Sequence, residues 1–184
     1  MAARYSVCVT REQPSLPKLW LLSDARNDAG IEAALRALPR RSGFVFRHYH
    51  LDPVARRARF DELAAIARNH GHSVILAGAG EWGADGHYGP PQAWGAGLRL
   101  ATAHDGAELQ EAIAAGADGI FLSPVFPTAS HPDAATLGIH GFHVLAQQSP
   151  VPVIALGGMD SGRARELDWP RWGAIDGLAS TKVA

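Results

Sequence analysis

The sequence contains very little cysteine and lysine, and both shortages exclude particular chemistry. Cys8 is the only cysteine among 184 residues, so no intrachain disulfide can form and a thiolate-ligated metal site is not expected. Lys18 and Lys182 are the only lysines, beside fifteen arginines. Lys18 stands at the start of the first apolar run and Lys182 close to the C-terminus, whereas a Schiff-base aldolase on a strand-based scaffold needs its nucleophile near the inner end of a strand. That class of enzyme is therefore not expected.

The chain also lacks net charge and long apolar runs. Its formal charge is -1 at pH 7 with no block of like charge, so neither nucleic acid nor an anionic membrane surface is an expected partner. No window approaches the ~18 uninterrupted apolar residues of a membrane helix. The first residues, "MAARYSVCVTREQPSLPK", have no apolar core of the kind found in signal peptides. We expect a cytoplasmic protein with a small-molecule partner.

Short apolar runs alternate with amphipathic segments along the chain. The expected strands cover 18–24, 43–51, 72–78, 85–88, 98–104, 118–126, 151–159 and 174–180. The expected helices cover 29–41, 54–71, 105–116, 138–148 and 162–173. Continuously apolar strands that alternate with helices predict a parallel sheet covered by helices, and eight such strands predict a closed barrel.

The predicted fold class is α/β: residues 1–184 form a single domain, an abbreviated (β/α)8 TIM barrel, with 1–17 as an N-terminal extension. A full barrel usually needs ~200 residues or more. Two places account for the shorter length of this chain. The third helix is shortened in the Gly- and Pro-rich stretch 79–97, and the final helix is missing. The exposed flank would be covered by residues 1–17 or by a second copy in a homodimer.

Four motifs in the second half resemble one family. They are "LATAHDGAEL" (100–109), "GADGIFLSPVFPTASHP" (116–132), "LGIHG" (137–141) and "PVPVIALGGM" (150–159). Together they resemble the thiamine-phosphate synthase and thiazole tautomerase superfamily, whose members are phosphate-binding barrels of thiamine biosynthesis. The resemblance is good over residues 98–180 and weak over 19–97. It implies a small phosphorylated, thiazole-type substrate.

A phosphate site is expected after the last two strands. Strand seven runs into Gly157 and Gly158, and strand eight into Ser180 and Thr181. In eight-fold barrels these two loops commonly bind phosphate through backbone N–H groups, and glycine permits close approach. The alternative is that Gly-Gly is only a tight turn and Ser-Thr a chain terminus. The family motif upstream favours the phosphate site.

The synthases of this superfamily join a pyrimidine diphosphate to a thiazole phosphate and expel pyrophosphate. That chemistry uses Mg²⁺ on carboxylates together with cations for the leaving diphosphate. The resemblance implies a Gln-x-Arg-x-Lys pattern on strand two, but this chain keeps only Arg47, between Val45 and Tyr49. Where the family has an Asn-Asp pair after strand three, this chain has Ala77 and Gly78.

The loop after strand four is "GHYGPPQ", without a carboxylate, and the loop after strand six has His131 where the synthases have a lysine. We therefore expect no metal site and no cofactor, with Mg²⁺ required only under the synthase alternative. The synthase, also called thiamine-phosphate pyrophosphorylase, remains the alternative enzyme, a transferase. A non-catalytic paralogue that binds a thiamine-pathway phosphate is also open.

The tautomerase branch resembles this chain better, because its members use a histidine in a "PTxSHP"-like loop. Their isomerase reaction aromatises a thiazole carboxylate phosphate by moving one proton. Histidine, with an ordinary pKa near ~6.5, can donate and accept a proton at neutral pH. His131, in the proline-rich loop after strand six, is therefore the expected catalytic residue. A solvated loop histidine is the plainer interpretation.

Four further residues are expected to bind substrate. Thr128 and Ser130 could hydrogen-bond the substrate carboxylate or cap the loop. Arg47 would point into the barrel and pair with that carboxylate. Thr102 is the better candidate to reach the pocket, while His104 should support the start of the next helix. The remaining histidines are expected to pack on helices or to face solvent, not to bind a metal.

Overall fold

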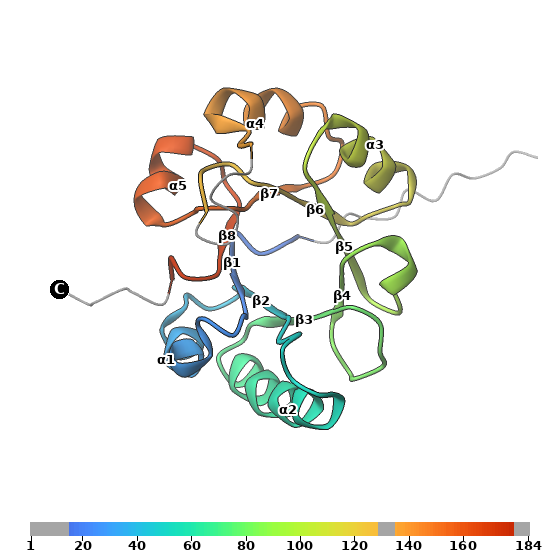
Figure 1. Ribbon diagram of the computed structural model, residues 1–184, viewed down its shortest axis with the longest axis vertical. Coiled ribbons are helices and arrows are strands. Elements are labelled where there is room, and N and C mark those ends of the chain that lie inside the picture. Colours follow the sequence, from blue (N-terminus) through green and yellow to red (C-terminus); the bar gives the residue numbers. More distant parts are fainter. Residues whose placement is uncertain (1–14, 129–134, 179–184) are drawn as a thin grey trace, which may run out of the picture.

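Eight parallel strands form the centre of the computed structural model, which describes residues 15–128 and 135–178. The strands are β1 (Leu19–Leu22), β2 (Gly43–Phe46), β3 (Ser73–Ala77), β4 (Gly86–Tyr88), β5 (Leu98–Ala103), β6 (Gly119–Leu122), β7 (Val153–Ala155) and β8 (Trp172–Ala174). Each strand pairs with the next in sequence, and β8 pairs with β1, which closes the barrel (Figure 1). The expected fold class is confirmed.

Helices cover the outside of this barrel unevenly (Figure 1). They are α1 (Asp28–Ala37), α2 (Pro53–Asn69), α3 (Gly106–Ala114), α4 (Gly138–Ala146) and α5 (Ser161–Leu167), with a 3₁₀ turn, η1, at Pro91–Ala93. The described part has no α-helix between β3 and β4, none between β4 and β5, and none in residues 175–178 after β8. The abbreviation expected for the third and final helices is therefore confirmed within these ranges. None of the helices that the structure describes is long and apolar enough to cross a bilayer.

Two apolar layers separate the barrel from its helices. On one side, α1 and α2 pack on β1–β3 around the buried rings of Phe44 and Phe60. On the other, α3, α4 and α5 pack on β5–β8 around Leu109, Phe142 and Leu167. The apolar periodicity of each helix matches the face that it buries, because residues three and four apart lie on the same side.

A third apolar cluster fills the interior of the barrel. It contains Leu16, Trp20, Leu22, Val45, Ile75, Ala77, Tyr88, Leu100, Phe121, Ile154 and Leu156. Leu16 is only 3 % exposed, and its Cδ1 lies 2.4 Å from where a Cβ on Gly119 would stand. Gly119 begins β6, so Leu16 closes the amino end of the barrel. Residues 15–17 are therefore part of the barrel, although the sequence assigns them to an extension.

The last helix and strand end earlier than their sequence pattern indicates. Helix α5 stops at Leu167, because Asp168 adopts a left-handed conformation with φ 49° and Pro170 follows shortly after. Strand β8 is Trp172–Ala174, so the expected range 174–180 is wrong. The loop after β8 consequently begins at Ile175.

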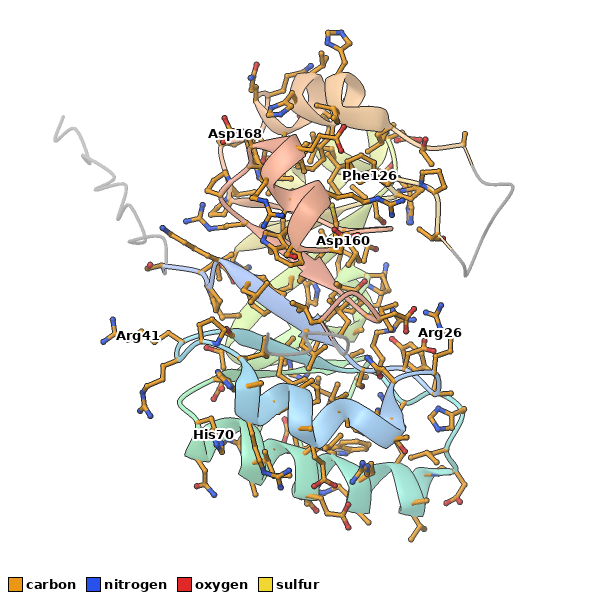
Figure 2. The ribbon with its side chains drawn as sticks, turned by 90° about the vertical axis from the view of Figure 1, so that its left-hand side faces the viewer. Arg26, Arg41, His70, Phe126, Asp160 and Asp168 are labelled. Atoms are coloured by element: carbon orange, nitrogen blue, oxygen red, sulfur yellow. The ribbon has the colours of Figure 1, made fainter. Side chains whose placement is uncertain are left out.

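The two ends of the barrel differ in what they present (Figure 2). Arg26 and Phe126, which follow β1 and β6, lie at the carboxyl end of the strands. Arg41 and His70, which precede β2 and β3, lie at the opposite end. Ligands of parallel α/β folds bind at the carboxyl ends, where loops from separate strands converge.

Candidate functional site

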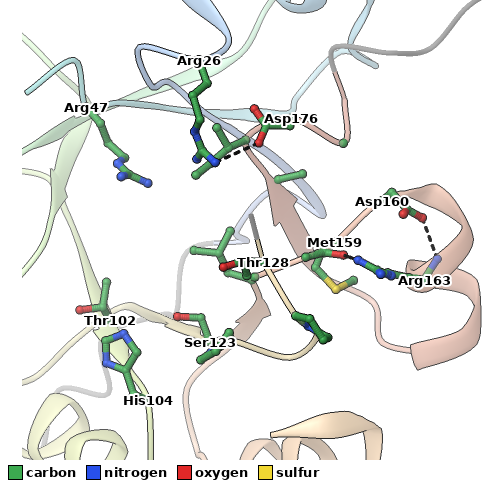
Figure 3. Close-up of a pocket in the computed structure, with 18 of the residues that line it drawn as sticks. Arg26, Arg47, Thr102, His104, Ser123, Thr128, Met159, Asp160, Arg163 and Asp176 are labelled. Atoms are coloured by element: carbon green, nitrogen blue, oxygen red, sulfur yellow. Dashed lines mark hydrogen bonds and ion pairs between the residues drawn. The ribbon is translucent and has the colours of Figure 1, made fainter. Parts of the chain in front are cut away.

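A cavity of about 740 Å³ lies at the carboxyl end of the barrel (Figure 3). The loops after most of the strands contribute to its lining. Arg26 and Arg47 occupy one side, and Thr102, His104 and Ser123 occupy another. A volume of this size matches that of pockets for small organic ligands.

The glycine turn after β7 forms one wall. Gly157 and Gly158 have φ values of 89° and 65°, which side chains rarely tolerate. A Cβ on Gly157 would lie 2.6 Å from Pro124 Cα, and one on Gly158 2.6 Å from the Pro127 carbonyl oxygen. Both residues line the cavity, and their N–H groups have no hydrogen-bond partner within the described ranges. The turn therefore offers amide donors to an anion.

Arg163 of α5 and Asp160, which caps the start of that helix, support this turn. The Arg163 guanidinium donates to the Gly158 carbonyl and lies 5.2 Å from the centre of the Phe126 ring. The Asp160 carboxylate accepts from the N–H groups of Gly162 and Arg163 at 2.8 and 2.9 Å. The first amides of α5 are therefore already bonded, so the amides of the turn itself are the available donors.

Arginines from the loops after β1 and β2 form the opposite, cationic wall. Arg47 lines the cavity as expected, and within the described ranges its one ion pair is long, with 3.4 Å from Nη2 to Asp24 Oδ2. Arg26 binds Asp24 at 2.9 Å and Asp176 at 3.3 Å. Burial acts to raise the pKa of Asp24, but the hydrogen bonds and positive charges of the arginines outweigh it and hold the pKa below its usual value. Asp24 thus stays ionised between two guanidinium groups.

Hydroxyl groups line the space between these walls. Thr102 and Thr128, both expected to bind substrate, line the cavity together with Tyr88 and Ser123. Burial raises the pKa of Tyr88 to about 12, so its phenol remains a hydrogen-bond donor at neutral pH. His104 also reaches the rim, while its Nδ1 bonds the Glu108 carboxylate at 2.7 Å.

The sequence reasoning identified only part of this lining. It did not single out Arg26, Tyr88, Arg163 or Asp176 as pocket residues. Arg26, Tyr88 and Asp176 follow or end a strand, and that position was the available signal, whereas Arg163 lies within α5. Their convergence depends on which side of the chain faces the barrel axis, which the short strands leave ambiguous.

Four of the expected site residues, His131, Ser130, Ser180 and Thr181, lie outside the described residues. The place expected for Ser180 and Thr181, directly after β8, is taken by Ile175, Asp176 and Gly177. Strand β8 ends six residues before Ser180, and phosphate binding by Ser180 and Thr181 stays a prediction.

The donor set does not fit the magnesium ion that the synthase reaction uses. Strands β3 and β4 lead into Gly78 and Gly89, which have no side-chain oxygen. The carboxylates of Asp24 and Asp176 are bonded to arginine. Across residues 15–128 and 135–178, no three His, Cys, Asp or Glu side chains are grouped to hold a metal ion. The described residues therefore supply no ligand set for magnesium.

Two buried histidines give the barrel a predicted pH dependence. His48 is fully buried and His72 is 4 % exposed, and burial lowers the pKa of both below the ordinary value of 6.5. Below pH 6.5 these two histidines bind protons in the unfolded chain but much less in the folded barrel. The free energy of unfolding is therefore higher above pH 6.5 and decreases as the pH falls. Each histidine contributes at most about 1.4 kcal/mol per pH unit.

Urea denaturation at pH 7.5 and 5.5 measures this effect. The free energy of unfolding should be lower at pH 5.5, and a His72→Gln variant should show a smaller difference between the two pH values. An equal or greater stability at pH 5.5 would show that these side chains are charged in the folded protein.

Comparison with known proteins gives consistent results. Residues 97–170 match the family described as thiamine monophosphate synthase. A thiamine-phosphate synthase of Chloroflexus aurantiacus is 35% identical over 79 residues, which are 42% of this chain and 35% of that protein. The thiamine-phosphate synthase of Pyrococcus furiosus is 37% identical over 62 residues, 32% of this chain and 30% of that protein.

The fold similarity extends further than the sequence similarity. A solved structure of thiamine phosphate pyrophosphorylase from Pyrococcus furiosus superposes with a TM-score of 0.75, covering 90% of this chain and 88% of that chain at 20% identity. At this identity the superposition shows the shared barrel. The aligned regions span about a third of the length of the curated relatives.

Proposed function

We propose, on the premise that residues 97–170 place this barrel in the thiamine-phosphate synthase superfamily, that the protein is an enzyme of thiamine biosynthesis acting on a small phosphorylated thiazole. One observation carries the proposal. The cavity places the amide donors of Gly157 and Gly158 on one wall and the guanidinium of Arg47 on another. A ligand with two separated anionic groups would satisfy both walls.

The names of the relatives favour the synthase reaction for this pocket. In that reaction a carbon–nitrogen bond forms between a pyrimidine diphosphate and a thiazole phosphate, and pyrophosphate leaves. The thiazole phosphate would bind the glycine turn. Arg47 and Arg26 would neutralise charge on the departing pyrophosphate, a role for which preorganised cations are effective.

A second candidate is the tautomerase reaction, and the donor set of the site favours it. Strands β3 and β4 lead into glycine where carboxylates would hold a metal-bound diphosphate. A proton shift on a thiazole carboxylate phosphate needs no such group. His131 would take a proton from a ring carbon and deliver one to the exocyclic carbon. The phosphate would lie on the glycine turn and the carboxylate on Arg47, supported by Thr102, Thr128 and Ser130.

Assaying both reactions side by side tests the proposal. Pyrophosphate release from the pyrimidine diphosphate and thiazole phosphate reports the synthase. Aromatisation of the thiazole carboxylate phosphate, followed by its ultraviolet spectrum, reports the tautomerase. Rate acceleration in the first assay alone supports the synthase, and in the second alone the tautomerase.

A His131→Ala variant identifies the acid–base group in a tautomerase. Its rate should fall by about 100-fold or more, as for the loss of a principal acid–base residue. The matched control is His140→Ala, since His140 is an exposed histidine of α4 in the same half of the chain. Activity in neither assay would contradict the proposed enzyme and leave a binding protein.

A further inference from the structure

His48 is a buried imidazole next to Arg47 that does not line the cavity. Its side chain is fully inaccessible and stacks on Phe46, with 4.8 Å between ring centres and 6° between planes. Its φ of 32° is uncommon for a residue with a side chain and persists only where the surroundings hold it. The chain therefore turns sharply at this position, and Arg47 faces the cavity while His48 faces the helical layer.

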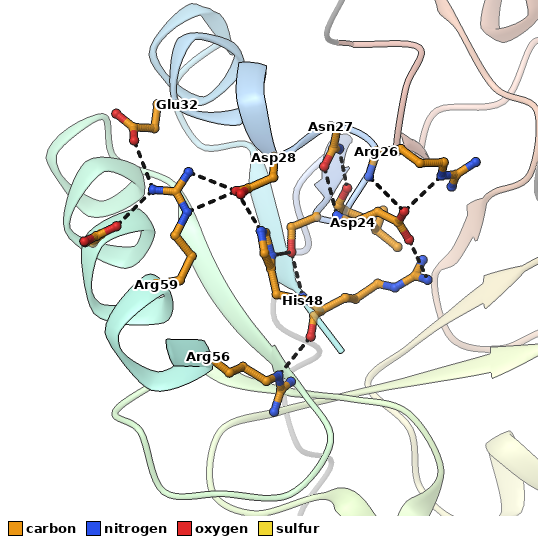
Figure 4. Close-up of polar contacts among 12 residues, drawn as sticks. Asp24, Arg26, Asn27, Asp28, Glu32, His48, Arg56 and Arg59 are labelled. Atoms are coloured by element: carbon orange, nitrogen blue, oxygen red, sulfur yellow. Dashed lines mark hydrogen bonds and ion pairs between the residues drawn. The ribbon is translucent and has the colours of Figure 1, made fainter. Parts of the chain in front are cut away.

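A hydrogen-bonded relay connects this imidazole to the backbone of Arg47 (Figure 4). His48 Nε2 lies 2.8 Å from Asp28 Oδ1, and Nδ1 lies 2.7 Å from Ser23 Oγ. Ser23 Oγ also accepts the Arg47 N–H at 2.7 Å. Because an ionised carboxylate only accepts, Nε2 carries the proton; Nδ1 then accepts the Ser23 hydroxyl proton, whose oxygen is free to accept from Arg47.

An arginine from α2 fixes the far end of the relay. Arg59 donates to Asp28 Oδ1 from Nε at 3.0 Å and from Nη2 at 2.9 Å, and its Nη1 donates to Glu32 and Glu62 at 3.0 and 2.9 Å. Burial acts to raise the pKa of Asp28, but the bonds from His48 and Arg59 outweigh it and lower the pKa. The carboxylate therefore stays ionised and maintains one tautomer.

The charge state of His48 agrees with this direction of donation. Burial lowers its pKa and outweighs the attraction of Asp28, and the nearby His50 and Arg59 act in the same direction as burial. At neutral pH the ring is neutral, so its Nδ1 is an acceptor. Protonation of Nδ1 would end the donation from Ser23.

Serine, histidine and aspartate in this order resemble a hydrolase triad, but the environment excludes that role. Ser23 is fully buried and is absent from the cavity lining. Its oxygen already bonds both the Arg47 amide and the His48 ring. A substrate in the cavity therefore has no access to this hydroxyl as a nucleophile.

We propose that Asp28, His48 and Ser23 are positioning residues that hold the Arg47 backbone so that its guanidinium faces the ligand cavity. This inference rests on the proposed function for its ligand, an anion at Arg47. Arg56 supports the same segment from below, donating from Nε to the Arg47 carbonyl at 3.0 Å and from Nη2 to the Ala77 carbonyl at 2.7 Å. Both backbone polar groups of Arg47 are thus anchored by side chains.

The test compares two buried histidines replaced by phenylalanine. His48→Phe keeps the aromatic stack but removes both relay bonds. His72→Phe is the matched control, because His72 is also buried and, among the residues that the structure describes, its side chain bonds the Leu35 carbonyl alone. Amide exchange of Arg47, measured by NMR, should accelerate by about tenfold or more in His48→Phe, the equivalent of one lost hydrogen bond, and stay near wild type in the control. Equal exchange in both variants would overturn the inference.

Ligand binding separates this inference from the proposed function. Inorganic pyrophosphate, titrated calorimetrically, should bind His48→Phe about tenfold more weakly than His72→Phe. Unchanged affinity in His48→Phe would overturn a role in ligand binding. Suppose that the wild type fails to bind pyrophosphate while amide exchange of Arg47 still accelerates in His48→Phe. In that case the positioning role of His48 is supported and the anion site at Arg47 is wrong. Should His48→Phe fail to fold, Ser23→Ala removes the acceptor of the same amide and gives the same exchange test.

Discussion

Replacement of Arg47 by methionine is expected to lower kcat/KM by about 100- to 1000-fold in whichever of the two assays the wild type is active, as for other losses of a preorganised donor. The guanidinium lines the cavity, and its link to Asp24 is long, at 3.4 Å. Its Nε is buried without a hydrogen-bond partner in the described part of the chain. Most of its donor capacity is thus unused until an anion binds.

Two further variants test whether the loss of activity is specific to the guanidinium of Arg47. Arg47→Lys should recover little activity, because an ammonium group cannot form the paired hydrogen bonds of a guanidinium. Arg36→Met is the control, since Arg36 is half exposed on α1 and pairs with Glu32 one turn away, outside the cavity. Activity of Arg47→Met within threefold of wild type would contradict an anion site at this wall.

Replacement of Trp20 by alanine is expected to lower the free energy of unfolding by about 3–5 kcal/mol, the usual cost of removing a large buried ring. Trp20 is fully buried in the barrel interior and packs edge-to-face on Phe121, with ring centres 5.4 Å apart. Its indole N–H donates to the Pro17 carbonyl at 2.9 Å, which ties the segment before β1 to the core. The loss combines removed packing with an orphaned carbonyl.

Neighbouring glycines provide an internal control for this stability experiment. Trp20 lies in register with Gly43 of β2 and Gly173 of β8, and a Cβ on Gly43 would stand 2.1 Å from Trp20 Cε3. Gly43→Ala should therefore destabilise the wild-type protein by overpacking. In the Trp20→Ala background the same substitution should destabilise the protein much less, because the space next to Gly43 is then open. Val54→Ala, at an 80 % exposed site, should change stability by less than about 0.5 kcal/mol. Additive effects at Trp20 and Gly43 in denaturant unfolding would contradict this packing.

The barrel could be predicted from sequence because its elements are encoded locally. Buried parallel strands such as "VILA" (74–77) are continuously apolar, and helices such as α2 carry their own start signal, with Asp52 accepting from the N–H groups of Val54 and Ala55. The weakest pattern was at the C-terminus. There the range 174–180 was apolar enough for a strand, but pairing with β1 selected Trp172–Ala174 instead.

The candidate site was only partly predictable. Gly157 and Gly158 could be identified because two consecutive glycines after a strand indicate a special backbone, and their positive φ values agree. Arg47 could be identified because "VFRHY" (45–49) resembles the family's strand-two pattern, and the structure places it directly after β2. Arg26 could not, because its contact with Asp176 joins residues 150 positions apart, and no local pattern encodes such a pairing.

The sequence by itself determined the order of strands and helices and the abbreviated architecture, since these follow from periodicity and short-range turn signals. Only the tertiary structure decided which side chains meet. Closure of the barrel brings Arg47 and the glycine turn to one cavity. Behind that cavity it joins Ser23 after β1 and Asp28 of α1 to His48 after β2. The physical reason is that contacts of this kind depend on the register and twist of the whole sheet, which every strand sets together with its neighbours.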